Sequence, residues 1–531
     1  MPEPRRSLAL AACFALALAL CFPFRLGSLH FDGGVALGWV AALPLALLLR
    51  GRPAGPAFGW TWGASTVGFA AILWWIWVVV AVHGHAPAAV AVVAVVALAG
   101  FVGLHVALGG WLCAVLEPAA GGLGFLVLPA SWTVAEWLRS VSLAHGFPWA
   151  FLGYAAHRDG PLLELASLGG VYGLTFVMVL SGVLLARRRW AAALALFAGL
   201  HGLGFALRLE ARFEPRAAPR HAAVIQANIP QDDKWDPAKA AQAFAAHLEL
   251  SRLVAAAGPL DLIVWPEASA PVFLERQPQY LDQVRRLARE TGATLLVGGM
   301  GLDVRPGPDP RDWRFFNSLF QISADGELRE RYDKSVLVPF GEYVPYRWLF
   351  GFLSGVATGL ATGDLTPGPG SRVLEFDGAP AHALAPLICY EVLYPAVVRR
   401  AVQRGARVLV NVTNDAWYGR SSAPEQFLAM AAVRSAENGV PMLRAANTGV
   451  SAIVDSDGAV LERTRLFERA AIRAEVPAAR SGMTPYTRWG DWVVWGCIGF
   501  LGALGGRRIV GRLGTGARDT ATDRSAGREG R

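Results

Sequence analysis

The chain has 531 residues, of which 54% are hydrophobic and only 17% charged, and its mean hydropathy is +0.37. These values exclude an ordinary soluble protein, which is more polar. The formal net charge of +8 could indicate a nucleic-acid partner, but many basic residues cluster beside apolar segments, which favours a role in membrane topology instead.

Apolar residues are concentrated at 7–207 and 491–505, and a bilayer span needs about 20 such residues. The pattern predicts about eight spans, at 7–23, 35–49, 63–82, 87–116, 123–139, 165–186, 190–207 and 491–506. With an even number of spans, the basic clusters fall on one side: Arg5–Arg6, Arg50 and Arg52, Arg187–Arg189, and Arg507, Arg508 and Arg512. The positive-inside rule places that side and both termini in the cytoplasm of a bacterial inner membrane.

This reading divides the chain into four parts. Residues 1–207 form an N-terminal transmembrane domain of about seven helices, and the polar region 208–488 is expected in the periplasm. A C-terminal transmembrane helix follows at 489–509, and the tail 510–531 is expected to be disordered in the cytoplasm. The N-terminal apolar run resembles a signal peptide, but the absence of a suitable cleavage site favours an uncleaved first span.

Two features stand out in the N-terminal half. Glu136 and Arg139 lie three residues apart on one helical face, and both an ion pair between helices and a contact with substrate are open. The aromatic stretch HGFPWAFLGYAAHRDGP, at 145–161, predicts a loop at the level of the lipid head groups.

The polar region alternates short β-type runs with helical stretches. It opens with HAAVIQANI at 221–229 and continues with runs such as LDLIVWPEA, ATLLVGGM and ARVLVNVTND. This alternation predicts a layered α/β domain. In such domains, the ends of the strands are the usual place for a functional site.

Three strand-end segments carry reactive groups. IVWPEASAP supplies Glu267, RYDKSVLVPFGEYVP supplies Lys334, and LICYE supplies Cys389, the one cysteine of the polar region. A base, an ammonium and a thiol together suit nucleophilic acyl transfer, with Lys334 stabilising the thiolate and the oxyanion. Each residue alone is more often structural, but their joint occurrence favours a site. No metal-ligand pattern is present, so neither a metal nor a cofactor is predicted.

Four motifs together resemble the nitrilase, or carbon–nitrogen hydrolase, superfamily: WPEA, YDKSVLVPFGEYVP, LICYE and NVTNDAWYG. The catalytic Glu, Lys and Cys of that superfamily fall on Glu267, Lys334 and Cys389. The spans, and the wording of PFGEYVP and NDAWYG, make the whole chain similar to the apolipoprotein N-acyltransferase family. The resemblance implies an α/β nitrilase-like αββα sandwich inserted in an all-α transmembrane bundle of about eight helices.

The same resemblance implies further site residues and a reaction. Glu342 corresponds to an essential second carboxylate, Tyr390 and Glu391 flank the nucleophile, and Trp235 corresponds to a functional tryptophan. The implied reaction moves the sn-1 acyl chain of a phospholipid, typically phosphatidylethanolamine, onto the cysteine as a thioester. The α-amino group of a diacylglyceryl-cysteine apolipoprotein then receives the chain in a ping-pong sequence.

Two other functions are open on the sequence. A membrane-tethered amidase could use the same three residues with water as acceptor, and a scaffold could retain the fold without activity. Both substrates of the acyltransferase are lipid-anchored, which accounts for the spans, and no partner subunit is required, so a monomer is expected.

Overall fold

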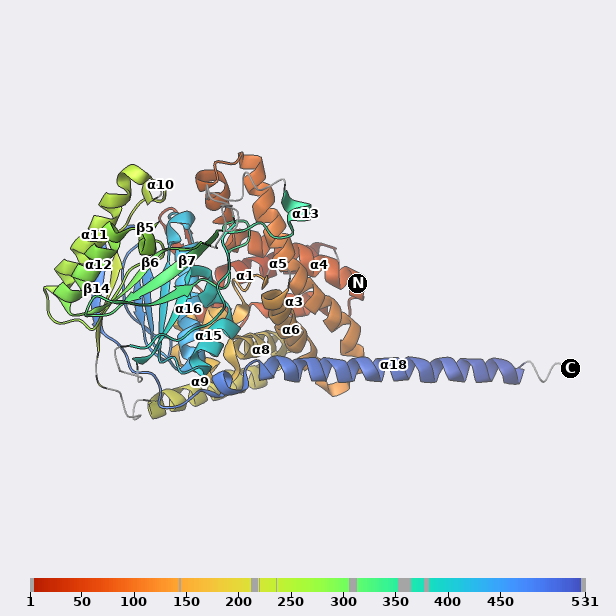
Figure 1. The fold of residues 1–531 in the computed structure, drawn as a ribbon. Helices are drawn as coiled ribbons and strands as arrows, with labels where there is room; N and C mark the ends of the chain where they lie inside the picture. The colour runs from red at the N-terminus through yellow and green to blue at the C-terminus, as the bar shows by residue number, and fades with distance from the viewer. Residues whose placement is uncertain are drawn as a thin grey trace.

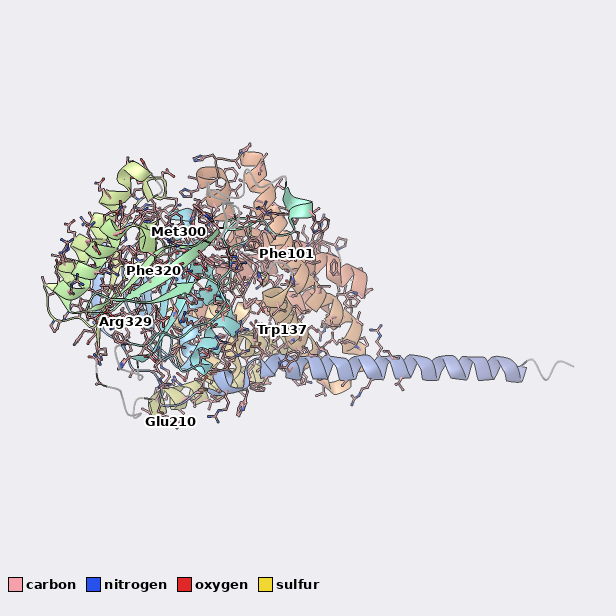
Figure 2. The ribbon with its side chains drawn as sticks, in the orientation of Figure 1. Phe101, Trp137, Glu210, Met300, Phe320 and Arg329 are labelled. Atoms are coloured by element: carbon pink, nitrogen blue, oxygen red, sulfur yellow. The ribbon has the colours of Figure 1, made fainter. Side chains whose placement is uncertain are left out.

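The structure, a computed structural model, describes residues 4–142, 145–211, 218, 220–234, 236–304, 313–351, 364–376 and 382–526. A helical region, built from the N-terminal segments and the last helix, lies beside an α/β domain (Figure 1). Figure 2 labels Trp137 in the helical region and Phe320 in the sheets, on opposite halves of the molecule.

Two sheets form the centre of the α/β domain. The first has seven strands in the order β14-β3-β4-β6-β7-β8, with β5 paired to β6, and the second has the order β13-β12-β11-β10-β9. Pairing is parallel from β3 through β4 to β6 and from β9 through β10 to β11, and antiparallel at the outer strands. The strands span His221–Gln226 (β3), Leu262–Val264 (β4), Ala270–Phe273 (β5), Thr294–Asp303 (β6), Arg314–Ile322 (β7), Leu328–Asp333 (β8), Leu384–Ile388 (β9), Val408–Thr413 (β10), Met442–Ala446 (β11), Ala452–Val454 (β12), Val460–Arg463 (β13) and Ala470–Glu475 (β14).

Helices cover both outer faces of the paired sheets (Figure 1). On one side, α11 (Pro237–Ala255) and α12 (Pro278–Thr291) pack on the seven-stranded sheet; α12 buries apolar residues at helical spacing, among them Leu281, Val284 and Leu287. On the other side lie α15 (Pro395–Gln403) and α16 (Ala423–Asn438), and α16 also contacts the helical region. The expected nitrilase-like layering of the α/β domain is confirmed.

The structure places a helix in each of the eight segments predicted to span the membrane. These are α1 (Pro4–Leu20), α2 and α3 (Gly34–Leu37 and Ala42–Leu49), α4 (Ala54–Ile72), α5 (Ala88–Leu116), α6 (Val127–Val141), α8 (Ala166–Ala186), α9 (Trp190–Ala211) and α18 (Trp492–Ala526). Among the described residues, four helical stretches are long and apolar enough to cross a membrane, and they lie in α5, α8, α9 and α18. The full count of eight spans stays a prediction.

The C-terminal tail differs from expectation. The sequence predicted disorder from residue 510, but α18 continues to Ala526 and projects beyond the rest of the molecule (Figure 1). The helix thus runs without a break from its apolar first half into the polar tail.

Basic residues gather at one end of the helical region. The Arg52 side chain donates to Ser7 Oγ over 2.8 Å, which brings the start of α1 beside the end of α3. Arg187, after α8, pairs with Glu117, after α5, and Arg508 of α18 bonds to a carbonyl at the end of α5. Three of the four predicted basic clusters therefore contribute a residue to this end.

The α/β domain is attached at the opposite end of the same helices. Gln426 of α16 donates to the carbonyls of Pro23, just after α1, and Ile72, at the end of α4, over 3.0 and 3.2 Å. Glu437 accepts the backbone N–H of Val171, near the start of α8, over 2.7 Å. Because α1 alone is about 25 Å long at 1.5 Å per residue, the two ends are well separated.

The centre of the aromatic stretch 145–161 lies inside the molecule. Residues 148–156 are buried, while the expectation that the loop lies at the level of the lipid head groups stays a prediction. Arg139 donates to the carbonyl of Trp149 over 3.1 Å, and Glu136 accepts the N–H of Leu152 over 2.8 Å. These side chains satisfy backbone groups that burial would otherwise leave unpaired, which favours a structural role for both.

Candidate active site

Each of the three predicted catalytic residues follows a strand. Glu267 comes three residues after β4, Lys334 directly follows β8, and Cys389 directly follows β9 and opens the 3₁₀ turn Cys389–Leu393. Because β4 and β8 belong to one sheet and β9 to the other, the three side chains converge where the two sheets meet. The structure thus brings together residues that are up to 122 positions apart in the sequence.

Cys389 has a strained backbone. Its φ of +51° lies in the left-handed region, which a residue with a side chain rarely adopts and which is common at functional sites. Two polar contacts hold this turn. Glu391 accepts the N–H of Ile388 over 2.8 Å, and Asn411 Nδ2 contacts the carbonyl of Cys389 at 3.4 Å. The left-handed backbone at Cys389 therefore gives the thiol a direction that a residue within a regular strand would not have.

Lys334 lies between two carboxylates. Its Nζ is 2.9 Å from Glu342 Oε1 and 3.5 Å from Glu267 Oε1, and the lysine side chain is 1% exposed. The Asn317 amide donates to both carboxylates, over 2.7 Å to Glu267 and 3.0 Å to Glu342. The second Glu342 oxygen accepts the N–H of Val338 over 2.8 Å. Glu342 therefore orients and partly neutralises the ammonium.

The electrostatics of the site leave the thiol protonated at rest. Burial raises the pKa of Cys389 and the Glu267 carboxylate raises it further, while Lys334 and the Thr413 hydroxyl act in the opposite direction. Burial lowers the pKa of Lys334, but Glu342 and Glu267 outweigh it, so the pKa of the ammonium lies above its ordinary value. Attack by Cys389 therefore requires a base that removes the thiol proton. Glu267 is the carboxylate that has the largest effect on the pKa of this thiol.

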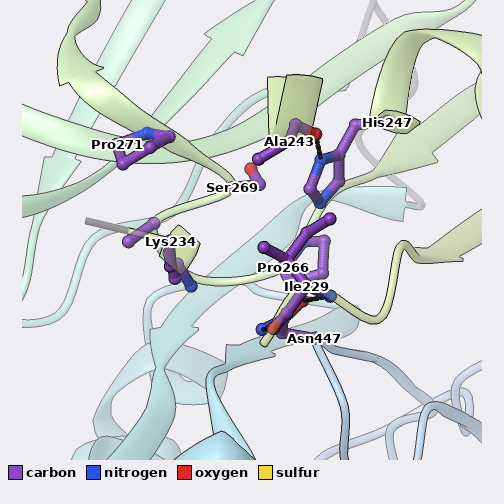
Figure 3. Close-up of a pocket in the computed structure, with 9 residues that line it drawn as sticks. Ile229, Lys234, Ala243, His247, Pro266, Ser269, Pro271 and Asn447 are labelled. Carbon is purple, nitrogen blue, oxygen red and sulfur yellow. Dashed lines mark hydrogen bonds between the residues drawn. The ribbon is translucent and has the colours of Figure 1, made fainter. Parts of the chain in front are cut away.

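Besides Asn317, two further residues that the sequence analysis missed hold Glu267. The backbone N–H of Asn414 donates to Glu267 Oε2 over 2.8 Å, and Lys234 Nζ donates to the main-chain carbonyl of Glu267 over 2.7 Å. Lys234 is 3% exposed, and burial lowers its pKa to about 8, against partial compensation by Glu267 and Cys389. A small pocket behind the Glu267 turn is lined in part by Lys234 and Pro266 (Figure 3).

Glu391 ties the nucleophile to the lysine segment. One of its oxygens accepts from Tyr332 Oη, Ser335 N and Ser335 Oγ over 2.7–2.8 Å and from Val336 N over 3.2 Å. The other oxygen accepts from Ile388 N, next to Cys389. The buried carboxylate acts as a brace between the two segments and leaves no oxygen for a substrate.

Tyr390 packs inside the site region and is 5% exposed. Its ring meets that of Tyr394 edge-on, with 5.3 Å between centroids. Trp235, the remaining predicted site residue, lies outside the described residues. Among the residues that the structure does describe, no cluster of three or more His, Cys, Asp or Glu side chains could hold a metal ion.

An aromatic cluster joins the active site to the helical region. Tyr418, whose pKa is raised above all by burial, lies against Trp75 and Trp149, with ring centroids 5.0 and 6.1 Å away. Trp75 follows α4 and Trp149 belongs to the buried stretch described above. Helical-region residues therefore contribute to the apolar surroundings of the thiol. The motif NDAWYG, which contains Tyr418, was visible in the sequence. Its contacts with Trp75 and Trp149 were not.

A second buried polar network lies behind the nucleophile. The Arg444 guanidinium pairs with Asp415 at 3.0 Å and also bonds to Asn411, the residue that contacts the Cys389 carbonyl. Asp415 accepts from the Thr413 hydroxyl over 2.8 Å. Because all of these groups are satisfied inside the protein, they make the strand ends around Cys389 rigid.

Known families match both parts of the chain. Residues 221–486 match the carbon-nitrogen hydrolase family, and residues 15–184 match the apolipoprotein N-acyltransferase N-terminal domain. An amidase from Nesterenkonia is a solved structure similar to the α/β part, with 20% identity, a TM-score of 0.36, and coverage of 50% of this chain and 93% of the amidase. The two family matches and the apolar helices define a membrane protein with a carbon–nitrogen hydrolase domain.

Relatives extend over nearly the whole chain. The apolipoprotein N-acyltransferase of Geobacter metallireducens is 36% identical over 93% of this chain and 94% of its own length. That of Pseudomonas putida is 34% identical over 96% of this chain and 97% of its own length. The chain belongs to the apolipoprotein N-acyltransferase family, and it is a membrane-bound acyltransferase.

Proposed function

We propose that the protein transfers the sn-1 acyl chain of a phosphatidylethanolamine-like phospholipid to the N-terminal α-amino group of a diacylglyceryl-cysteine apolipoprotein. The observation that carries the proposal is the convergence of Glu267, Lys334 and Cys389 at the strand ends, beside aromatic side chains of the helical region. Such a site can form a covalent acyl-enzyme and pass its acyl group to a second substrate.

In the first step, Glu267 removes the thiol proton while the sulfur of Cys389 attacks the ester carbonyl. Lys334 stabilises the oxyanion of the tetrahedral intermediate. When that intermediate collapses, the C–O bond of the ester breaks, and protonated Glu267 gives its proton to the lysophospholipid that leaves. The product is a thioester on Cys389.

In the second step, the apolipoprotein amine attacks the thioester carbonyl and Glu267 takes a proton from the attacking nitrogen. The C–S bond then breaks, the amide is released, and the thiol is restored by the proton held on Glu267. Lys334, held by Glu342 at 2.9 Å, supports the oxyanion in both steps. Glu391, Glu342 and Tyr390 position these groups.

The placement of the domain supports lipid substrates. We propose that residues 208–488 face the periplasm, because the α/β domain is attached to the helices at the end opposite to Arg52, Arg187 and Arg508. Moving an acyl chain into water costs about 0.8 kcal/mol for each CH₂. A site held against the bilayer avoids that cost, since the chain can stay in apolar surroundings while its ester reaches the thiol.

The decisive experiment is intact-mass analysis of the purified protein after incubation with phosphatidylethanolamine. We expect an added acyl mass that hydroxylamine removes at neutral pH, as a thioester requires, and no such adduct on Cys389→Ala. Cys13→Ser is the matched control, because Cys13 is an exposed cysteine outside the site and its loss leaves the adduct unchanged. An adduct that persists on Cys389→Ala removes that residue from the nucleophile role.

A second measurement separates acyl transfer from hydrolysis of small amides by the same residues. The acyl-enzyme is isolated and mixed with a synthetic diacylglyceryl-cysteine peptide. We expect the peptide to gain one acyl chain as the enzyme loses it. Release of free fatty acid without peptide acylation, or of ammonia from small amides at comparable rates, would instead indicate a hydrolase.

A further inference from the structure

A polar cavity lies between the helical region and the α/β domain, away from the catalytic residues described above. It has a volume of about 260 Å³, and its walls are a β-hairpin, β1 (Phe24–Leu26) and β2 (Leu29–Phe31), the end of the buried stretch at Arg158, and the start of α16. The hairpin is bound to α16, since the N–H of Arg25 donates to Ser422 Oγ over 2.8 Å. The cavity is therefore part of the junction between the two halves.

Three arginines line this cavity, against two carboxylates. Arg158 lies 3.1 Å from Asp32, and Arg463 lies 2.5 Å from Glu425, so each of these cations has an anion beside it. Arg25 has none among the described residues, and its Nε is buried without a hydrogen-bond partner. A buried guanidinium N–H without a partner is costly and is usually satisfied by an anion or by water.

The hairpin also exposes large apolar side chains beside the cavity. Leu26, Leu29 and Phe31 are 56%, 60% and 42% exposed. The hairpin follows α1 directly, at the end of the helices that carries the α/β domain, where a spanning helix leaves the hydrocarbon core. Exposed apolar groups at this depth indicate insertion into the edge of the bilayer, and this places Arg25 at the level of lipid phosphates.

We propose that this cavity binds the phosphate of a phospholipid head group, with Arg25 as its principal ligand and Arg158 at its rim. Arginine matches phosphate oxygens by paired N–H donors, and basic pockets beside spanning helices suit lipid head groups. Asp32 and Glu425 reduce the positive charge of the cavity and suit a head group that also carries an ammonium. The bound lipid helps to hold the hairpin on α16 and is a structural lipid of the junction between the two halves. Its acyl chains lie along Leu26, Leu29 and Phe31.

The test measures lipid binding without catalysis, so it stands apart from the proposed acyl transfer. Full-length Cys389→Ala protein in detergent is titrated with dihexanoylphosphatidylethanolamine, with dihexanoylglycerol, which lacks the phosphate, and with inorganic phosphate. We expect Arg25→Gln to weaken the phospholipid Kd about tenfold, the size of one lost charge-assisted contact, and Arg158→Gln to weaken it less. Arg252→Gln, an exposed arginine of α11 paired with Glu290, is the matched control and leaves the Kd unchanged.

Folding is checked by thermal unfolding of each variant without lipid, and Arg25→Lys retains the charge and restores most of the binding. If Arg25→Gln does not fold, the phospholipid Kd of Arg158→Gln alone tests the proposal. A phospholipid Kd that neither substitution changes overturns the proposal, as does equal binding of dihexanoylglycerol. Inorganic phosphate that binds as tightly as the phospholipid, with the same dependence on Arg25, identifies a free-phosphate site and overturns the lipid assignment.

Discussion

Replacing Glu391 by glutamine tests whether this residue braces the active site. Glutamine has the same shape, and its carbonyl oxygen can still face the donors of Tyr332, Ser335 and Val336. Its NH₂ group then points at the N–H of Ile388, which the carboxylate accepts over 2.8 Å. One hydrogen bond to a charged group, worth about 1.5–3 kcal/mol, is replaced by two opposed donors, at a further cost of about 1–3 kcal/mol. We therefore expect a loss of about 2.5–6 kcal/mol of stability.

The loss acts on the nucleophile because Ile388 precedes Cys389, whose backbone is already strained. Thermal unfolding in detergent should show a decrease of about 2–5 °C, and intact mass should show slower thioester formation. The KM for phospholipid should stay unchanged, since Glu391 faces only protein groups. Glu290→Gln, at an exposed ion pair, is the control. The bracing role of Glu391 would be refuted if Glu391→Gln unfolded at the wild-type temperature and was acylated at the wild-type rate. A change in KM alone would refute it as well.

Two further substitutions test the support of Glu267. The pKa of Lys234 is lowered by burial to about 8 from 10.5, so between these pH values the unfolded chain holds a proton that the folded chain has released, and stability rises with pH. Lys234→Met should abolish this rise in pH-dependent thermal unfolding and slow thioester formation about tenfold. Gly298→Ala places a Cβ 2.8 Å from Ala268 N and 2.9 Å from Glu267 Cα, and intact mass should show impaired acylation, whereas Gly502→Ala, with no atom within 4 Å, should not.

The sequence predicted those features that depend on local pattern. Apolar runs located a helix in each of the predicted spans, and alternating strands and helices predicted the layered domain. The motifs around Glu267, Lys334 and Cys389 identified side chains that the fold brings together, since strand ends are where such a domain assembles a site. For the tail beyond residue 510 the polar composition predicted disorder, whereas α18 continues to Ala526.

Other features arise only from contacts between distant segments. In the sequence, nothing distinguishes Lys234 from other charged residues, and only the fold buries it against the Glu267 carbonyl. The role of Glu391 likewise depends on donors more than 50 positions away. The aromatic stretch 145–161 reads as an interfacial loop, yet Glu136 and Arg139 satisfy its backbone and allow its burial. Composition, spacing and the family motifs thus predicted the class of protein, the helical segments and the reactive trio. The tertiary structure decided which polar groups are buried and paired, because the cost of burying a charge or an N–H depends on partners that only the folded chain supplies.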